Sequence, residues 1–380
     1  MRRITENWIK DQAAQKVCAM LTDAGKQAWF VGGCVRNALL GAPVSDLDIS
    51  TDARPEEVIA LAAAGGLKPV PTGIDHGTVT VVVDRHPFEV TTFRRDVETD
   101  GRRAVVAFAD TMEEDASRRD FTMNALYAAP DGTVVDPLGG LPDLEARRVR
   151  FIGDPHDRIR EDYLRILRFF RFHAWYGSDG LDRDGYAACA ELSDGLENLS
   201  KERVGHEFRR LLAAPDPAPS VAAMEAAGVL LRVLPGTRTG QLAVLVHLEG
   251  EAGLAPDWQR RLVTLGGDPA KALRLSKAET RRTQALSDAM QSEASAGELG
   301  YRLGAIDAID ALVLRASLYV TPFDPVAAQE AGFGAEQVLP IKARDLADRH
   351  SGPALGAAFA EAEARWIASG FRLTREDLLA

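Results

Sequence analysis

The chain has 380 residues and a formal net charge of −11, with 46% hydrophobic and 27% charged residues. This balance is typical of a globular protein, and the length favours two or three domains with a sizeable core. No apolar run approaches the roughly 18 residues that a membrane-spanning helix needs, and no apolar segment follows the charged N-terminal residues. We therefore expect a cytoplasmic protein with no signal peptide and no membrane partner.

The three cysteines, Cys18, Cys34 and Cys189, are scattered along the chain. They show neither the spacing of a metal site nor the even number of a disulfide framework. We expect reduced and mostly buried thiols.

The first predicted elements are a helix and a strand–turn–helix–strand unit. Residues 5–25 have the pattern of an amphipathic helix that ends at a glycine, and the unit follows over residues 29–51. Its first strand ends at Gly32-Gly33, where a helix begins. The backbone N–H groups at such a helix start form an anion site, and Arg36, one turn later, can add a contact to phosphate oxygens.

Two acidic residues, Asp46 and Asp48, are spaced i, i+2 in the strand-like end of this unit. Side chains two apart on a strand point to the same face. Two like charges at ~4 Å repel by roughly 4 kcal/mol at an effective dielectric of 20, so we expect a cation between them, and Mg²⁺ has the matching ligand preference. A glycine pair or an Asp-x-Asp motif alone is more often a turn or a solvated edge. Their combination favours phosphoryl or nucleotidyl transfer.

The next elements are predicted to be a helix over residues 51–64, which contains Pro55 near its start, and a hairpin with strands over 79–84 and 88–93. Glu89 lies on the second of these strands. If that strand lies beside the strand of Asp48, Glu89 offers a third carboxylate to the metal. The polar and acidic stretch 94–117 predicts a mobile loop over the site.

A further helix is predicted to run from Ser117 to Tyr127. It carries Arg119 and places Asp120 and Asn124 one turn apart on one face. An acid and an amide there can accept hydrogen bonds from ribose hydroxyls, whereas the alternative is a polar helix cap. We place the main domain boundary in the turn-rich segment 134–143.

From Asp157 the pattern predicts a helix with an apolar core stripe. Asp162 and Arg165 lie on a neighbouring stripe and project together. Their simplest role is an ion pair worth ~0.2–0.5 kcal/mol. A second role is base recognition, because a carboxylate accepts from the exocyclic amine of cytosine or adenine while a guanidinium donates to the ring, which discriminates bases by ~1–3 kcal/mol.

The same region is basic, although the whole chain is acidic. Eight arginines but only four acidic residues lie between Arg147 and Arg171. A basic stripe on an acidic body suits a protein that binds RNA along one groove, and a solvated arginine-rich helix face is the alternative. Arg168, nearly one turn after Arg165, is a candidate phosphate contact.

The rest of the chain is predicted to be helical. Residues 201–212 form one helix, and a proline-rich break follows at 215–219. Residues 220–380 are rich in alanine and leucine, with glycine and proline breaks, and contain no motif that indicates a function.

These motifs together resemble the class II tRNA nucleotidyltransferases, the CCA-adding enzymes, and their relatives the bacterial poly(A) polymerases. The resemblance covers residues 29–212, a little under half of the chain. One departure is Asn37, where the family usually has aspartate after the arginine, and this affects a local structural contact. The motifs that carry the resemblance are Gly32-Gly33-Cys34-Val35-Arg36, Asp46-Leu47-Asp48, Arg119-Asp120 with Asn124, Glu161-Asp162 with Arg165, and the helix 201–212.

The resemblance implies an α+β fold. An N-terminal nucleotidyltransferase head with a small mixed sheet flanked by helices is followed by an all-helical neck, body and tail. The implied domains are a catalytic head over 1–140, a neck with a base-reading helix over 141–213, and a tRNA-binding body and tail over 214–380.

The resemblance also implies a role for each candidate residue. These roles are metal binding and catalysis for Asp46 and Asp48, with Glu89 as a further metal ligand; triphosphate binding for Gly32, Gly33, Arg36 and Arg168; ribose binding for Arg119, Asp120 and Asn124; base binding for Asp162 and Arg165; and structural support for Glu161, Glu202, Arg203 and Glu207.

The implied activity is template-independent addition of CMP and AMP to the 3′ end of tRNA, from CTP and ATP, with Mg²⁺ as cofactor. A bacterial poly(A) polymerase is the nearest alternative, although the segment 73–79 is similar to the CCA-adding type. An enzyme that adds only CC or only A is also open. A catalytically silent tRNA-binding protein on the same scaffold is disfavoured by the intact acid pair. No protein partner is expected.

Overall fold

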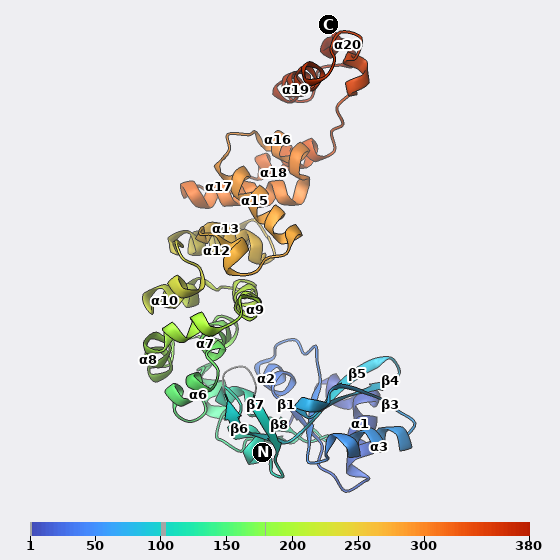
Figure 1. Ribbon diagram of the computed structural model, residues 1–380, viewed down its shortest axis with the longest axis vertical. Coiled ribbons are helices and arrows are strands. Elements are labelled where there is room, and N and C mark those ends of the chain that lie inside the picture. The colour runs from blue at the N-terminus through green and yellow to red at the C-terminus, as the bar shows by residue number, and fades with distance from the viewer. Residues whose placement is uncertain (1, 100–103, 179) are drawn as a thin grey trace. The chain divides into compact units, whose positions relative to one another are not determined.

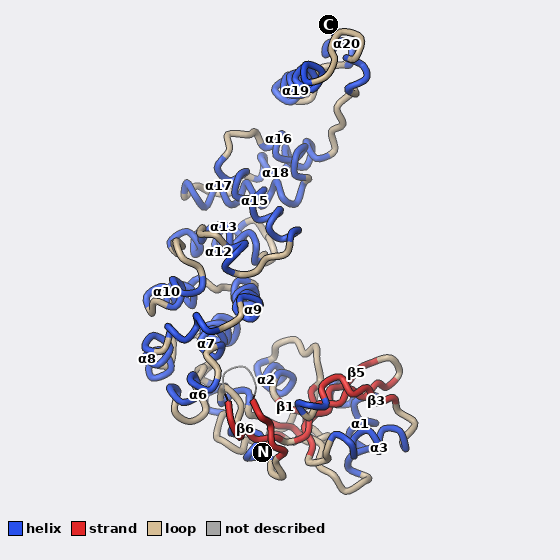
Figure 2. The backbone as a smooth tube through the Cα atoms, in the orientation of Figure 1, coloured by secondary structure: helices blue, strands red, loops and turns tan. Residues whose placement is uncertain are grey.

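A computed structural model of the protein describes residues 2–99, 104–178 and 180–380. The chain forms two compact units, Met1–Glu207 with Ala226–Arg232, and Phe208–Glu225 with Val233–Ala380. Every strand that the structure describes lies in the first unit, and the second is helical (Figures 1 and 2). The predicted fold class, a mixed sheet followed by helices, is confirmed. The finer boundaries at residues 140 and 213 stay predictions.

A seven-stranded sheet forms the centre of the first unit. Its strand order is β3-β4-β5-β2-β1-β8-β9, and all neighbouring pairs are antiparallel except β2 with β5. The strands are β1 Trp29–Val31, β2 Asp48–Thr51, β3 Lys68–Gly73, β4 Thr78–Val83, β5 His86–Thr92, β8 Tyr127–Ala128 and β9 Val134–Val135.

Two helices pack against the β4 and β5 side of this sheet. Alternate residues of β4 are buried, as expected for a strand with one covered face, and helices α1 (Gln12–Thr22) and α3 (Pro55–Ala64) pack against β4 and β5. Asp48 and Glu89 are direct partners in the parallel β2–β5 register. The predicted hairpin, and its position beside the strand of Asp48, are confirmed.

The helix after the glycine pair is α2, Gly33–Leu40. Gly32 precedes it with φ +72°, a conformation that favours glycine. The predicted strand–turn–helix–strand unit is therefore confirmed, except that Asp46 lies in the loop before β2 and Asp48 is the first residue of the strand.

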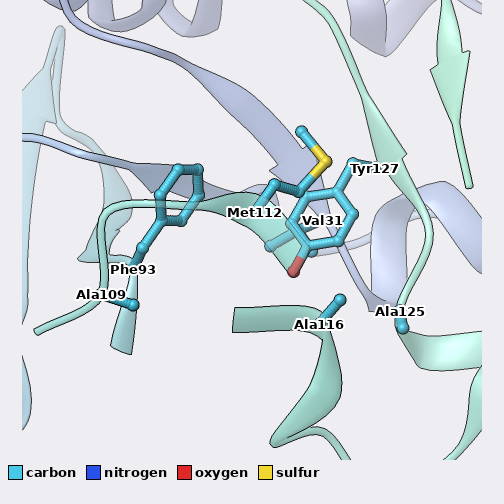
Figure 3. Packing of buried hydrophobic residues seen from close by; sticks show 7 residues of the cluster. All are labelled: Val31, Phe93, Ala109, Met112, Ala116, Ala125 and Tyr127. Atoms are coloured by element: carbon cyan, nitrogen blue, oxygen red, sulfur yellow. The ribbon is translucent and has the colours of Figure 1, made fainter. Parts of the chain in front are cut away.

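Residues 94–117 form regular structure in place of the predicted loop. They contain the hairpin of β6 (Arg94–Thr99) and β7 (Ala104–Phe108), followed by helix α4 (Met112–Ser117), while residues 100–103 lie outside the described part of the chain. The ends of this segment are anchored by apolar side chains, which its polar composition obscured. The buried cluster consists of Val31, Phe93, Ala109, Met112, Ala116, Ala125 and Tyr127 (Figure 3).

The predicted helix from Ser117 to Tyr127 is wrong. Helix α4 ends at Ser117, and a short 3₁₀ helix, Thr122–Asn124, precedes β8. The carboxylate of Asp120 accepts from the backbone N–H of Phe121 at 2.9 Å and from the side-chain amide of Asn124 at 2.8 Å. Such local hydrogen bonds compete with a helix, but they still bring Asp120 and Asn124 together.

The predicted helix from Asp157 is divided in two at Asp162. That residue is extended, with φ −154° and ψ 105°, and its carboxylate accepts from the backbone N–H of Leu164 at 3.0 Å. Tyr163 packs on Gly195, where a Cβ would lie 2.0 Å from the tyrosine ring. The helices of this region are α5 Leu141–Glu145, α6 Pro155–Glu161, α7 Leu164–Tyr176, α8 Arg183–Glu191 and α9 Lys201–Leu212.

The C-terminal part of the chain is helical, as predicted. Within the described residues, no helix combines the length and the apolar composition needed to cross a bilayer. The helices are α10 Ala218–Ala226, α11 Val229–Val233, α12 Gly240–Glu251, α13 Trp258–Leu265, α14 Pro269–Ala272, α15 Lys277–Gln291, α16 Ala296–Leu303, α17 Ala305–Tyr319, α18 Pro325–Ala335, α19 Pro353–Ala368 and α20 Arg375–Leu379.

Candidate functional site

Two pockets of the first unit share the residues Asp48 and Glu89. The arginine pocket, of about 440 Å³, is lined by Arg94, Arg118, Arg119, Arg165, Arg168 and Arg203 together with Asp48, Glu89, Asp120 and Asp162. The aromatic pocket, of about 630 Å³, is lined by Trp8, Asp11, Asp46, Asp48, His86, Pro87, Phe88 and Glu89, among others. The two shared carboxylates therefore lie where the pockets meet.

The three predicted metal ligands, Asp46, Asp48 and Glu89, line the aromatic pocket together. Burial raises the pKa of Asp48, and the negative charges of Glu89 and Asp46 raise it further, while Arg119 opposes them. Carboxylate oxygens are the ligands that Mg²⁺ prefers, and a cation here would relieve their repulsion. In the described part of the chain, no three His, Cys, Asp or Glu side chains are grouped closely enough to hold a metal ion alone. An ion bound here would therefore take part of its shell from water or substrate.

The glycine pair lies beside an arginine of the pocket. A Cβ at Gly32 would lie 3.4 Å from Nη1 of Arg119. Glycine thus meets two requirements at this position, the positive φ and the close approach of the guanidinium. The start of α2 at Gly33 lies next to this contact, as an anion site requires.

Arg36 does not line the arginine pocket. Its buried guanidinium donates to the hydroxyl of Tyr176 at 2.8 Å and lies 4.1 Å from the centre of that ring. It also donates to the side-chain oxygens of Asn37 and Asn124. The structure places Arg36 between α2 and α7, and its predicted contact with the triphosphate stays a prediction.

Asn37 stands where the family usually has aspartate, and the structure shows which local contacts the asparagine makes. Its oxygen accepts from Arg36 at 3.0 Å, and its amide donates to the carbonyl of Pro43 at 2.8 Å. A neutral amide therefore keeps the contact with Arg36 and adds one to the segment that leads to Asp46.

Asp115 is a buried acid that the sequence interpretation missed. Its carboxylate accepts from Arg119 at 2.9 Å, from Arg118 at 2.9 Å and from the hydroxyl of Tyr127 at 2.8 Å. Burial alone would raise the pKa of Asp115, but the charges of Arg119 and Arg118 lower it to about 2. The i, i+4 spacing of Asp115 and Arg119 was the available signal. This carboxylate fixes two arginines of the pocket.

Asp120 fixes a third arginine, Arg168. Nε of Arg168 donates to the Asp120 carboxylate at 2.8 Å, and Glu207 lies 3.7 Å from Nη1 of the same guanidinium. Burial would raise the pKa of Asp120, but the charge of Arg168 and the hydrogen bond from Asn124 lower it to about 2. Asp120 and Arg168 both line the arginine pocket.

The predicted ion pair between Asp162 and Arg165 is wrong. Asp162 accepts from Arg203 at 2.7 Å, whereas Arg165 pairs with Glu161 and donates to the carbonyl of Arg158 at 2.7 Å. The helix break at Asp162 separates the two side chains that a continuous helix would have paired. Both still line the arginine pocket, and Arg203 joins them there from α9.

Two further predicted residues, Glu202 and Glu207, do not line the arginine pocket. Glu207 is buried and accepts from Nε of Arg171 at 2.6 Å, and Glu202 lies in the first turn of α9. The basic stripe is largely neutralised by neighbouring acids. These pairs are Arg148 and Arg150 with Asp143, Arg158 with Glu161, Arg160 with Asp157, and Arg171 with Glu207.

Two segments of the chain match known domain families. Residues 28–150 match the poly A polymerase head domain, and residues 181–239 match the probable RNA and SrmB-binding site of polymerase A. The first segment contains the seven-stranded sheet and the two acids that the pockets share, Asp48 and Glu89. The second contains α8 and α9.

The chain is similar to proteins described as CCA-adding enzymes. One from Streptococcus gordonii is 41% identical over 244 residues, which are 63% of this chain and 60% of that protein. One from Leuconostoc citreum is 42% identical over 226 residues, which are 59% of this chain and 54% of that protein. The matches thus span less than two thirds of these relatives.

Solved structures show the same fold. The Bacillus stearothermophilus CCA-adding enzyme in complex with CTP has a TM-score of 0.74 and 29% identity, covering 94% of this chain and 93% of that one. The Thermotoga maritima CCA-adding enzyme complexed with tRNA has a TM-score of 0.71 and 17% identity, covering 100% and 97%. At this lower identity the second likeness concerns the fold alone.

Proposed function

Because this chain belongs to the family of poly(A) polymerases and CCA-adding enzymes, we propose that it adds CMP and AMP to the 3′ end of tRNA from CTP and ATP. The reaction requires a divalent cation, for which we propose Mg²⁺, and no nucleic-acid template. The observation that carries the proposal is the position of Asp48 and Glu89 at the margin of a pocket lined by six arginines. Transfer from a nucleoside triphosphate needs both kinds of group, the arginines to bind the phosphates and the carboxylates to hold the metal ion.

The acids are proposed to bind the metal. Asp46 and Asp48 would hold it, with Glu89 as a further ligand, because burial and then the negative charges of Glu89 and Asp46 raise the pKa of Asp48, and a cation would offset both effects. When bound, Mg²⁺ activates the RNA 3′-hydroxyl and neutralises charge on the leaving pyrophosphate.

The arginines are proposed to bind and orient the triphosphate. Arg119 and Arg168 are each fixed by a buried acid and also line the pocket. Their guanidinium groups can donate charge-assisted hydrogen bonds to phosphate oxygens. The N–H groups at Gly32 and Gly33 would add neutral donors beside Arg119. Orientation of the phosphates toward the acids then supplies much of the rate enhancement.

The sugar and base are proposed to contact different residues. Arg119, Asp120 and Asn124 would fix the ribose, and Asn124 orients Asp120 by donating to it. Asp162 and Arg165 would recognise the base from the two sides of the helix break. Since cytosine and adenine share an exocyclic amine at comparable positions, an acceptor and a donor can select both against uracil and guanine.

The decisive experiment uses three tRNAs, which end before CCA, after C and after CC. Each is incubated with the protein, Mg²⁺ and labelled CTP or ATP, and the products are resolved to single nucleotides. We expect two C additions and one A addition, followed by termination. Long A tails would indicate a poly(A) polymerase, and use of one nucleotide alone would indicate a partial enzyme. Binding of tRNA without incorporation would overturn the proposal.

A further inference from the structure

The aromatic pocket has no role in the function proposed above. Nucleotidyl transfer brings two substrates to the same acids, a nucleoside triphosphate and the 3′ end of an RNA. Two pockets of the first unit are lined by Asp48 and Glu89. Two pockets that share these acids offer one place for each substrate of the transfer.

The charges of the two pockets separate the substrates. Six arginines line the arginine pocket, which suits three linked phosphates. Among the described residues that line the aromatic pocket, none is lysine or arginine, while Asp11, Asp46, Asp48 and Glu89 are acidic. A triphosphate would be repelled there by all of its phosphates, whereas the 3′-terminal nucleoside of an RNA carries only the single charge of its 5′ phosphodiester.

The lining also suits a nucleoside in shape and chemistry. Its volume of about 630 Å³ lies in the usual range for small-molecule sites. The ring of Trp8 is fixed by an edge-on contact with Phe30 at 5.3 Å and by a hydrogen bond from its Nε1 to Glu6 at 2.9 Å. His86 and Pro87 are exposed at the start of β5. An aromatic ring fixed in this way can stack on a base without the loss of side-chain freedom.

We propose that the aromatic pocket binds the 3′-terminal nucleoside of the RNA acceptor, with its base against Trp8 and His86 and its hydroxyl toward Asp48 and Glu89. This rests on the proposed function and adds to it a location for the second substrate. The ligand class is a single-stranded RNA 3′ end. Base–aromatic stacking contributes about 1–3 kcal/mol per base and tolerates different bases. This tolerance is needed because the terminal base of the acceptor changes with each nucleotide that is added.

The test combines a change in the protein with a change in the RNA. The variants are Trp8→Ala, Trp8→Phe and His86→Ala, with Trp175→Ala as a control because Trp175 is exposed and lies outside the pocket lining. Affinity is measured for a tRNA ending in CC and for the same tRNA with an abasic terminal residue, both without nucleotide. Steady-state KM values for tRNA and ATP are measured with the tRNA ending in CC.

We expect Trp8→Ala to weaken binding of the normal tRNA about tenfold and to raise its KM similarly, with KM for ATP unchanged. The abasic tRNA should bind wild type about tenfold more weakly and should not distinguish wild type from Trp8→Ala. Trp8→Phe should retain most of the affinity, and Trp175→Ala all of it. A thermal melt shows whether Trp8→Ala still folds, and the exposed His86 gives a second variant if it does not.

Unchanged tRNA affinity in both Trp8→Ala and His86→Ala would overturn the inference. A loss that is equally large for the abasic tRNA would also overturn it, because the contact would then not involve the base. Failure of wild type to incorporate nucleotides would instead contradict the proposed function, since the affinity measurement needs no catalysis.

Discussion

Arginine–carboxylate networks occur in both units, but they differ in their access to solvent. In the second unit, Glu249 accepts from Arg260 at 2.8 Å and from Arg261 at 2.7 Å, and these side chains are at most 4% exposed. In the first unit, Arg119, Arg168 and Arg203 are each paired with an acid but remain 18%, 31% and 38% exposed. The pairs around Glu249 are sealed, whereas those of Arg119, Arg168 and Arg203 line a pocket.

The partners of the sealed arginines explain the difference. Arg261 also donates to the carbonyls of Leu212, Ala214 and Pro215, just beyond helix α9, so its donors are used within the protein. The arginines of the pocket have an acid on one side and the pocket on the other. A buried ion pair alone therefore does not indicate a binding site. What marks the first network is that its acids orient arginines toward a cavity.

The largest effect is expected when an acid at the margin of the pockets is removed, because this tests whether the open network serves catalysis. Asp46→Ala should abolish nucleotide incorporation, because the proposed metal would lose a ligand worth several kcal/mol in the transition state. Asp46 is exposed in a loop, so the melting temperature should stay unchanged. Incorporation is measured with the tRNA ending in CC and ATP, and Asp23→Ala, an exposed acid at the end of α1, is the control. Robust turnover by Asp46→Ala would refute the role of this acid.

A substitution in the sealed network around Glu249 should lower the free energy of unfolding and leave nucleotide incorporation unchanged. Glu249→Gln leaves Arg260 and Arg261 buried without their shared charge, and breaking a buried pair costs about 3–5 kcal/mol. Urea unfolding measures this loss. The control is Glu251→Gln, on the same helix, whose side chain is 53% exposed beside His247. A loss below about 1 kcal/mol would mean that the network is not the constraint that its burial indicates.

The sequence predicted the parts of the site that depend on local patterns. The turn at Gly32-Gly33 and the strands of Asp48 and Glu89 follow from glycine and from period-2 alternation, which act over a few residues. That the two strands are neighbours was only a condition in the sequence analysis, and the structure fulfils it. The structure adds the register that makes Asp48 and Glu89 direct partners.

The parts that the sequence did not predict depend on particular side-chain contacts, some across the fold and one local. Arg203 pairs with Asp162 across 41 positions, so no spacing rule could indicate it. The helix predicted through Asp120 fails because its carboxylate bonds to the nearby backbone and to Asn124. Trp8 lies within the segment 5–25 that was predicted to be one amphipathic helix, and only the structure places it in the lining of a pocket.

A second test of the comparison measures how the stability of the protein changes as the pH is lowered. The pKa of Asp120 is lowered to about 2 in the folded protein, below its unfolded value of about 3.9. Its contribution to stability is therefore fully present above about pH 4 and is lost as the pH falls toward 2. For such a shift the loss amounts to about 2.6 kcal/mol.

Asp120→Asn should remove this part of the pH dependence. Urea unfolding of the first unit, measured from pH 5 to pH 2.5, should fall less steeply in the variant than in wild type. Asp288→Asn, an exposed acid on α15, should keep the wild-type slope. Parallel curves for wild type and Asp120→Asn would show that the pair with Arg168 contributes no pH-dependent stability.

The smallest expected effect tests whether an arginine of the open network reads the base. Arg165→Lys keeps the positive charge but loses the planar fork, so preference for CTP and ATP over UTP and GTP should fall about tenfold. The measurement is the ratio of kcat/KM values for each nucleotide with a matching tRNA. Arg171→Lys is the paired control, because Arg171 lies on the same helix but pairs with buried Glu207 behind the pocket. It should lower the melting temperature and leave selectivity intact. Equal loss of selectivity in both variants would mean that α7 acts through its packing, and the distinction between open and sealed arginines would not extend to base recognition.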